Sequence, residues 1–216
     1  MKALIIDTTL DTSYIILIEN YEIVVYKKFE KLNLSKELFL NLKNILNKTN
    51  TNLSDLEYIA TSIGPGSFTG LRVGASICKT ISYAKKIPLI SYISLKAYSP
   101  NIEGPFLVTI DAKSQGVFII EAKLKNDTVE YLSDVKLYTP DEATLLFNNY
   151  PLIVSPDADV LKEKFENYQN KFLKYQINPH KLVDLTNQIY INKEFEDYNS
   201  FDLLYLRGPN HTLAQS

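Results

Sequence analysis

The sequence has few of the residues that build metal centres and disulfides. Its 216 residues contain one cysteine, Cys78, and two histidines, His180 and His211. A single cysteine cannot form an internal disulfide, and no His or Cys pair has the spacing of a zinc site. We therefore expect no metal-binding residues and no zinc hydrolase. Cys78 lies in an apolar helical stretch with no histidine near it in sequence, which favours a packing residue over a nucleophile.

The sequence also lacks a strong charge of either sign and a long hydrophobic run. Its 23 Lys and Arg residues nearly balance its 25 Asp and Glu residues, for a formal net charge of -2, which excludes a strongly basic nucleic-acid binder. Arginine occurs only at Arg72 and Arg207, and the lysines are scattered. No apolar run approaches the roughly 18 residues of a membrane span, and the opening MKALIID lacks the apolar stretch of a secretory signal. We expect a cytoplasmic protein that makes no membrane contact.

Two distant segments repeat one pattern. Residues 4–19 read LIIDTTLDTSYIILIE, and residues 107–122 read LVTIDAKSQGVFIIEA. Each begins with an apolar strand that ends in an aspartate, Asp7 or Asp111, and continues through a short polar turn into a second β-rich strand. This self-similarity indicates that the chain contains two copies of one structural plan.

The elements around these segments repeat in the same order, with three strands followed by a helix, a strand, a helix, a strand and a helix. In the first half we expect strands at 2–7, 14–19, 22–28, 58–63 and 89–93 and helices at 35–48, at 69–85 and from Ser94. In the second half we expect strands at 105–111, 116–123, 128–136, 152–154 and 172–177 and helices at 139–148, 157–168 and 179–194.

This order of elements predicts an α/β protein. Three consecutive strands form an antiparallel meander, whereas strands separated by helices pair in parallel. Each half is therefore expected to be a mixed sheet flanked by helices. We place the two tandem domains at 1–102 and 103–216 and expect a ligand cleft between them.

The most specific segment is the glycine-rich turn GPGSFTGLRVG at residues 64–74, between an expected strand and an expected helix. Glycine permits positive φ and close backbone approach, and a helix N-terminus suits an anion, so this turn is a candidate phosphate site. The alternative is a tight connection whose glycines let the helix pack closely. The turn has neither the Lys-Ser/Thr ending of a P-loop nor the G-x-G-x-x-G pattern.

The two strand-end acids, Asp7 and Asp111, are expected at the cleft. Such carboxylates can hold a metal–phosphate complex, or they can cap turns by accepting hydrogen bonds from nearby backbone N–H groups. Both alternatives stay open at this point. Ser67 stands in the context P-G-S-F-T rather than in the G-x-S-x-G elbow of a serine nucleophile.

Two helices carry small or apolar surface beyond the needs of one core-facing stripe. In the helix at 69–85, small residues recur every four positions and form a ridge that another helix can approach closely: Gly70, Gly74, Cys78 and Ser82. In the helix at 35–48, apolar residues cover more than one stripe: Leu38, Phe39, Leu40, Leu42, Ile45 and Leu46. The ridge packs either against this protein's own first helix or against a partner.

Several motifs together resemble the TsaB family, also called YeaZ. They are Ile6-Asp7-Thr8-Thr9, GPGSFTGLRVG at 64–74, IDAKSQGVF at 110–118 and the ending Leu204-Tyr205-Leu206-Arg207. They follow the family's order along the whole chain, and GPGSFTG is the most specific of them. The resemblance implies two tandem actin-like (ASKHA, ribonuclease-H-like) domains, which agrees with the duplicated plan.

TsaB proteins are accessory subunits in the synthesis of threonylcarbamoyladenosine on the adenosine beside the tRNA anticodon. The resemblance implies that this chain is not itself an enzyme. It implies a heterodimer with a catalytic TsaD-like subunit, which this chain activates, and a TsaE-like ATPase that joins the pair. Contact with tRNA is expected only through the complex, and a homodimer could form on the same surface.

The family's contact surface consists of the first helix and the helix after the glycine turn. Carried over to this chain by the resemblance, the interface residues are Leu38, Leu42, Gly70, Gly74 and Cys78. On this expectation, Gly74→Arg abolishes pairing without unfolding the chain.

The resemblance also implies a cleft without a metal site, because TsaB proteins have lost the metal-binding histidines of the catalytic subunit. We expect no catalytic residues, no required cofactor and at most weak nucleotide binding. The vestigial cleft is assigned to Asp7, Thr8, Gly64, Gly66 and Ser67.

The chain departs from the family pattern in two places. Leu34-Ser35 stands where the family usually has His-Ser. In the second-half motif, the family's Asp-Ala-Arg and Gly-Glu-Val-Tyr are partly replaced, with Lys113, Gln115 and Phe118 at the changed positions. The alternative function is an ATP-dependent small-molecule kinase or phosphotransferase of the same superfold, suggested by the glycine turn and the strand-end acids.

Overall fold

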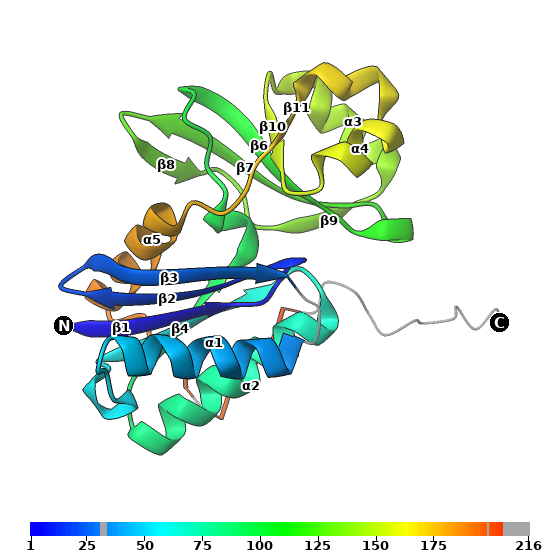
Figure 1. Ribbon diagram of the computed structural model, residues 1–216. Coiled ribbons are helices and arrows are strands. Elements are labelled where there is room, and N and C mark those ends of the chain that lie inside the picture. Colours follow the sequence, from blue (N-terminus) through cyan, green and yellow to red (C-terminus); the bar gives the residue numbers. More distant parts are fainter. Residues whose placement is uncertain (31–33, 198, 205–216) are drawn as a thin grey trace.

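Two mixed sheets with helices on their outer faces make up the computed structural model, which describes residues 1–30, 34–197 and 199–204 (Figure 1). The predicted α/β class, with two mixed sheets flanked by helices, is confirmed. None of the helices in these residues is long and apolar enough to cross a membrane. Part of the C-terminal sequence lies outside the described residues, including Tyr205, Leu206, Arg207 and His211.

The first sheet has five strands in the order β3-β2-β1-β4-β5. The consecutive strands β1, β2 and β3 pair antiparallel, whereas β4 pairs in parallel with β1 and β5, as strands joined through helices do. The elements of this half are β1 Lys2–Asp7, β2 Thr12–Glu19, β3 Glu22–Glu30, α1 Leu34–Lys48, β4 Tyr58–Gly64, α2 Phe68–Lys85, β5 Leu89–Ile93 and the 3-10 helices η1 Leu53–Asp55 and η2 Ser94–Ala97.

The second sheet repeats this arrangement in the order β11-β10-β6-β7-β8, with β9 also paired to β7. Its elements are β6 Gly104–Asp111, η3 Lys113–Gln115, β7 Val117–Lys125, β8 Thr128–Tyr131, β9 Lys136–Tyr138, α3 Pro140–Asn149, β10 Ile153–Ser155, α4 Ala158–Lys164, η4 Glu166–Lys171, β11 Phe172–Lys174 and α5 Pro179–Ile191. The predicted start of α3 is confirmed, because Thr139 and Glu142 form a capping box before Pro140.

Three predicted elements of the second half are shorter or divided. The strand expected at 128–136 is split into β8 and β9 because Leu132 and Ser133 leave the ladder. The Leu132 N–H donates to the Glu121 carbonyl, and the Glu121 N–H donates to Ser133 Oγ, so one residue of β7 bonds to both. The helix expected at 157–168 ends at Lys164 and continues as η4, and the strand expected at 172–177 ends at Lys174.

The two sheets share one apolar layer, because successive residues of a strand point to opposite faces. In β1, Ala3 and Ile5 face this shared layer, whereas Leu4 and Ile6 face α1 and α2. In β6, alternate residues such as Phe106 and Val108 face the shared layer, and Leu107 between them packs with α3 and α4. The order of layers is therefore α1 and α2, first sheet, shared core, second sheet, then α3 and α4 (Figure 1).

The last helix of the second half returns to the first sheet. Helix α5 contacts β3, β5 and η2, and it lies between the two sheets in Figure 1. Tyr58 of β4 donates a hydrogen bond to Asn187 Oδ1 at 2.8 Å, and its ring stacks on Tyr190 with centroids 4.8 Å apart. The division of the chain at residues 102 and 103 stays a prediction, and α5 is the element that packs across it.

The Tyr58 hydroxyl provides a test of this contact. Tyr58→Phe leaves the buried Asn187 carbonyl oxygen without its donor, and we expect the free energy of unfolding to fall by about 1 to 2 kcal/mol. Urea unfolding measures the change. The matched control is Tyr26→Phe, on the half-exposed surface of β3, which should leave stability unchanged. Equal effects of the two variants would contradict the contact's role.

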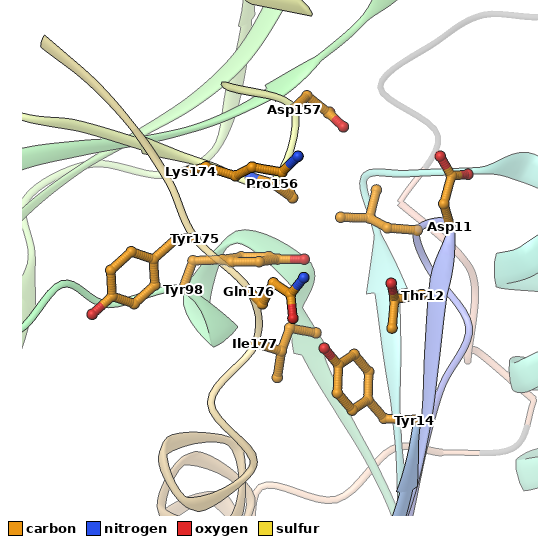
Figure 2. Close-up of a pocket in the computed structure, with 11 residues that line it drawn as sticks. Asp11, Thr12, Tyr14, Tyr98, Pro156, Asp157, Lys174, Tyr175, Gln176 and Ile177 are labelled. Atoms are coloured by element: carbon orange, nitrogen blue, oxygen red, sulfur yellow. The ribbon is translucent and has the colours of Figure 1, made fainter. Parts of the chain in front are cut away.

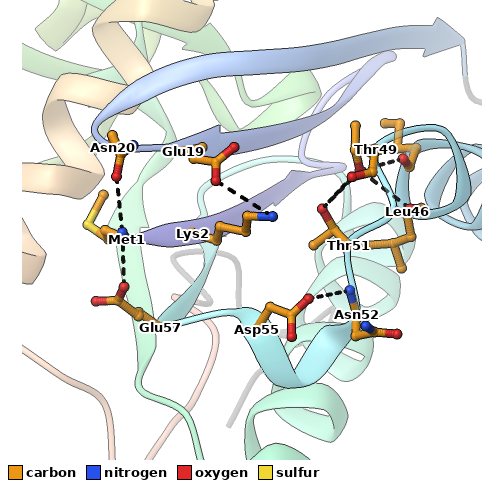
Figure 3. A network of polar contacts seen from close by, with 11 residues as sticks. Met1, Lys2, Glu19, Asn20, Leu46, Thr49, Thr51, Asn52, Asp55 and Glu57 are labelled. Atoms are coloured by element: carbon orange, nitrogen blue, oxygen red, sulfur yellow. Dashed lines mark hydrogen bonds and ion pairs between the residues drawn. The ribbon is translucent and has the colours of Figure 1, made fainter.

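Polar contacts hold the end of the first sheet that carries the N-terminus (Figure 3). The Met1 amino group bonds to Asn20 Oδ1 and pairs with Glu57 Oε1, each at 3.2 Å. Lys2 pairs with Glu19 across β1 and β2 at 3.6 Å. Because β1 starts at this end, its last residue, Asp7, lies at the opposite end of the sheet.

Candidate functional site

The glycine-rich turn connects β4 to α2. Gly64 ends the strand with φ +108°, a backbone conformation that favours glycine. Ser67 caps α2 by accepting a hydrogen bond from the Gly70 N–H. The turn thus has the strand-to-helix position predicted for it.

The glycines of this turn lie against the loop after β1. A Cβ on Gly66 would overlap Thr9 Cγ2 and approach the Thr9 carbonyl oxygen to 2.7 Å, and a Cβ on Gly74 would lie 2.5 Å from Thr8 Oγ1. The Ser67 N–H donates to the Thr9 carbonyl at 2.8 Å, and Thr8 Oγ1 donates to the Gly70 carbonyl at 2.6 Å. These contacts are those of a tight connection with close packing. A phosphate-facing role stays a prediction.

Both strand-end acids cap turns. Asp7 is 1% exposed, and its carboxylate accepts from the Thr9 N–H at 2.9 Å and from the Tyr92 hydroxyl at 2.7 Å. Asp111 accepts from the Lys113 N–H at 3.1 Å and pairs with Lys164 at 3.3 Å. Each aspartate therefore receives the N–H two residues further along, the arrangement of an Asx turn. Within the described residues, no group of three or more His, Cys, Asp and Glu side chains could hold a metal ion.

Two cavities lie between the halves of the chain. The larger, of about 240 Å³, is formed by residues that the sequence analysis did not select (Figure 2): Leu10, Asp11, Thr12, Tyr14, Tyr98, Pro156, Asp157, Lys174, Tyr175, Gln176 and Ile177. A smaller one, of about 100 Å³, is lined by Leu10, Asp11, Gly66, Ser67, Ile110, Asp111, Lys113 and Asp157. Of the five residues assigned to the cleft, Gly66 and Ser67 line the smaller cavity, whereas Asp7, Thr8 and Gly64 line neither.

Asp157 lies at both cavities, directly after β10 and Pro156. Its Oδ2 accepts a hydrogen bond from the Asp111 N–H at 3.0 Å, and burial raises the pKa of its carboxyl. Asp7 and Asp111 are the last residues of their strands, whereas Asp157 lies two residues beyond Ser155, the last residue of β10. The strand-end pattern in the sequence therefore does not reach Asp157, which lies at the start of the helix expected at 157–168.

This pKa shift has a consequence for the pH dependence of stability. A carboxyl whose pKa is higher in the folded chain than in the unfolded one costs stability as the pH rises from its ordinary value through the folded value. An asparagine can still accept from the Asp111 N–H but never ionises. We therefore expect the melting temperature of Asp157→Asn, compared with that of the unsubstituted chain at the same pH, to become higher as the pH rises from about 3.5 to 6.5. If the melting temperature of Asp157→Asn falls relative to that of the unsubstituted chain over this range, the pKa of Asp157 is not raised in the folded chain.

The two helices predicted to carry a contact surface lie next to each other on the outer face of the first sheet (Figure 1). All five residues selected on them are buried within the chain: Leu38, Leu42, Gly70, Gly74 and Cys78. Leu38, Leu42 and Cys78 belong to the core between these helices and the sheet. As contact residues for a partner they stay a prediction.

Other residues of the same helices face solvent. Large apolar side chains are exposed on α1 at Phe39, which is 63% exposed, and Leu40, and on α2 at Phe68 and Tyr83. Their signal was present in the sequence, because Phe39 and Leu40 fall off the stripe that the core requires. The expectation that Gly74→Arg spares the fold is at odds with the structure, because even a Cβ at this position meets Thr8 Oγ1.

The sequence of the chain is similar to that of known proteins. The family model "TsaD: tRNA N6-adenosine threonylcarbamoyltransferase" matches residues 31–177. The chain is 23% identical to "tRNA threonylcarbamoyladenosine biosynthesis protein TsaB" of Buchnera aphidicola subsp. Acyrthosiphon pisum, over 97% of this chain and 91% of that protein. It is 28% identical to the Bacillus subtilis protein of the same name, over 74% of this chain and 69% of that protein.

A solved structure confirms the fold. The structure described as "YeaZ from Pseudomonas aeruginosa" superposes with a TM-score of 0.77 at 15% sequence identity and covers 94% of this chain and 99% of that chain. The two mixed sheets flanked by helices that the repeated segments predicted are therefore correct.

Proposed function

The chain belongs to the TsaD family of tRNA N6-adenosine threonylcarbamoyltransferase, within it to the TsaB (YeaZ) proteins, and on this premise we propose that it is a non-catalytic subunit that pairs with a TsaD-like subunit and activates it. Its place in tRNA threonylcarbamoyladenosine biosynthesis follows from the family. Pairing, activation and the lack of catalysis by the chain itself are the proposal.

The observation that carries this proposal is the outer face of α1 and α2. These helices bury their inward stripe in the chain's own core and still expose large apolar side chains at Phe39, Leu40, Phe68 and Tyr83. Aromatic side chains are frequent anchors of protein interfaces. Such a face can pack helix against helix on a partner that also presents apolar helices.

The geometry of the strand-end acids supports an accessory rather than a catalytic role. A phosphotransferase needs a carboxylate and a glycine turn that are open to a nucleotide. Here Asp7 is buried and bonded to Thr9 and Tyr92, and Thr8 and Thr9 lie against the turn's glycines. The observation in favour of the kinase alternative is the smaller cavity, which Gly66, Ser67 and Asp111 line. Its volume of about 100 Å³ is far below the roughly 300 Å³ at which drug-sized ligand sites begin. In this proposal the chain requires no cofactor of its own.

The proposed assembly is a 1:1 pair that a TsaE-like ATPase joins, with tRNA contacted through the assembled complex. In this proposal, the same helix face pairs two copies of the chain when the TsaD-like subunit is absent. Activation then means that the accessory chain holds the catalytic subunit in its working conformation.

The proposal is tested by size-exclusion chromatography with light scattering, on the chain alone and mixed with the TsaD-like protein of the same genome. We expect a 1:1 complex to replace the free peaks, and threonylcarbamoyl transfer to tRNA to require both proteins. The absence of a complex between two folded preparations would overturn the pairing. Transfer at the same rate without this chain would overturn activation.

A further inference from the structure

The larger cavity lies on the opposite side of the first sheet from α1 and α2. Tyr14 of β2 and Tyr98, which follows η2, line it and belong to the shared core layer. Asp11 comes from the turn after β1, and Asp157 and Gln176 come from the second half of the chain. The cavity is therefore separate from the helix face that carries the proposed pairing.

The hydroxyl groups of two largely buried tyrosines point into this cavity (Figure 2). Tyr14 and Tyr98 are each 3% exposed. Within the described residues neither hydroxyl has a hydrogen-bond partner, whereas the buried Tyr58 and Tyr92 hydroxyls bond to Asn187 and Asp7. In the described residues, the side-chain oxygens that are both buried and unpaired are Thr9 Oγ1 and Ser13 Oγ. The two phenol oxygens therefore reach the solvent of the cavity, where water or a ligand can satisfy them.

The two phenols remain donors over the whole physiological range. Burial raises the pKa of Tyr14 to about 12, and it raises the pKa of Tyr98 well above its ordinary value. Both groups are therefore neutral, and each can donate one hydrogen bond and accept another.

Two polar side chains from β11 and the segment after it also line the cavity. Gln176 supplies a hydrogen-bond donor in addition to the two phenols, and the charge of Lys174 is paired with that of Asp159. Gln176 Oε1 accepts from Lys28 Nζ at 2.5 Å, which leaves the amide nitrogen as a donor at the cavity. The Lys174 ammonium group is 2.5 Å from Asp159 Oδ2, so its charge is balanced outside the lining.

The opposite end of the cavity carries two carboxylates, beside the Lys174 side chain that is ion-paired with Asp159. Figure 2 shows Asp11 and Asp157 at the end away from Tyr14. Asp157 uses Oδ2 to accept from the Asp111 N–H, and its other oxygen remains as an acceptor. A carboxylate pair of this kind disfavours phosphate and other anions.

Donors at one end and carboxylates at the other suit a ligand whose groups both accept and donate. Neighbouring hydroxyl groups have this property, and a carboxylate holding sugar hydroxyls is a recurrent mode of ribose recognition. A cavity of about 240 Å³ is below the range of drug-sized sites, which begins near about 300 Å³. We propose that this cavity binds an uncharged polyhydroxylated ligand of monosaccharide or nucleoside size, held by Asp11 and Asp157 at one end and by Tyr14, Tyr98 and Gln176 at the other.

The test is isothermal titration calorimetry on the full chain with three probes, adenosine, D-ribose and AMP. We expect saturable binding of at least one uncharged probe and at least tenfold weaker binding of AMP than of adenosine, because the added phosphate meets the two aspartates. Adenosine that binds at least tenfold more tightly than ribose assigns the site to a nucleoside, and a smaller difference assigns it to a free sugar.

Variants connect binding to the cavity. Tyr98→Phe keeps the ring and removes the hydroxyl, and we expect at least tenfold weaker binding of the uncharged probe. The matched control is Tyr150→Phe, whose hydroxyl bonds to Glu121 away from the cavity, and it should bind as the unsubstituted chain does. Asp157→Asn is a second variant, expected to weaken binding as well and chosen in case Tyr98→Phe does not fold.

Three results would overturn the proposal. They are the absence of saturable binding of both adenosine and ribose, binding of AMP as tight as that of adenosine, and unchanged binding in folded Tyr98→Phe or Asp157→Asn. None of these results bears on pairing with a TsaD-like subunit, which is measured separately by light scattering.

Discussion

We expect the Phe39→Asp variant to bind a TsaD-like subunit about 100-fold more weakly than the unsubstituted chain, a loss of about 2.7 kcal/mol. The reason is that the aspartate would be buried without a partner in the helix interface, where aromatic anchors carry much of the binding energy. Phe39 is 63% exposed in the chain alone, so its replacement leaves the core intact. Calorimetric titration with the partner measures the affinity, and thermal unfolding verifies the fold.

The matched control is Leu145→Asp. Leu145 is 68% exposed, also lies on a helix, and belongs to α3 on the far side of the second sheet. The same change there should leave affinity within about threefold. If Phe39→Asp binds as tightly as the control, the outer face of α1 is not the contact surface. Leu38→Asp is unsuitable, because Leu38 is buried and the variant would lose stability for reasons unrelated to pairing.

The second large effect is on stability. We expect Gly116→Ala to lower the free energy of unfolding by about 3 to 5 kcal/mol. Gly116 has φ +127° and ψ -131°, a region reached almost only by glycine. An added Cβ would overlap the Tyr138 carbonyl oxygen and lie 2.9 Å from its carbon. Tyr138 is held by pairing of β9 with β7 and cannot move away freely.

Gly104→Ala separates the two causes of this loss. Gly104 also has a positive φ, +118°, but a Cβ there would meet nothing within 4 Å. We expect about 1 to 2 kcal/mol of destabilisation from backbone strain alone. Urea unfolding of both variants measures the difference. Similar losses in the two variants would mean that the contact with Tyr138 adds nothing.

Much of the fold could be predicted from local patterns. The strand–aspartate–turn segment occurs twice, and the elements around it recur in the same order, so the two mixed sheets followed from the repetition. The expected strands at 2–7 and 89–93 match β1 and β5 to the residue. The split between β8 and β9 could not be predicted, because it depends on Glu121 bonding to Leu132 and Ser133 of the neighbouring strand.

The candidate site was less predictable than the fold. The glycine turn was placed correctly, but its two interpretations differ only in what lies opposite the glycines. Thr8 and Thr9 lie there, far away in sequence from Gly66 and Gly74. The helix surfaces were also only partly predictable. Periodicity placed Phe39 off the core-facing stripe, but it did not tell whether the small-residue ridge of α2 faces the chain's own core or a partner. The small residues Gly70 and Cys78 turned inward, and Phe39 outward.

The sequence by itself therefore determined the duplicated plan, the strand-end positions of Asp7 and Asp111, and the family through its GPGSFTG motif. These are local properties, because alternation, helical spacing and Asx turns depend on residues within one or two elements. Only the tertiary structure decided that α5 returns to Tyr58, that Asp7 is bonded by Tyr92, and that Tyr14 and Tyr98 meet at a cavity. Such contacts join residues from separate elements, and they exist only when the two sheets pack against each other and bury the apolar layer between them.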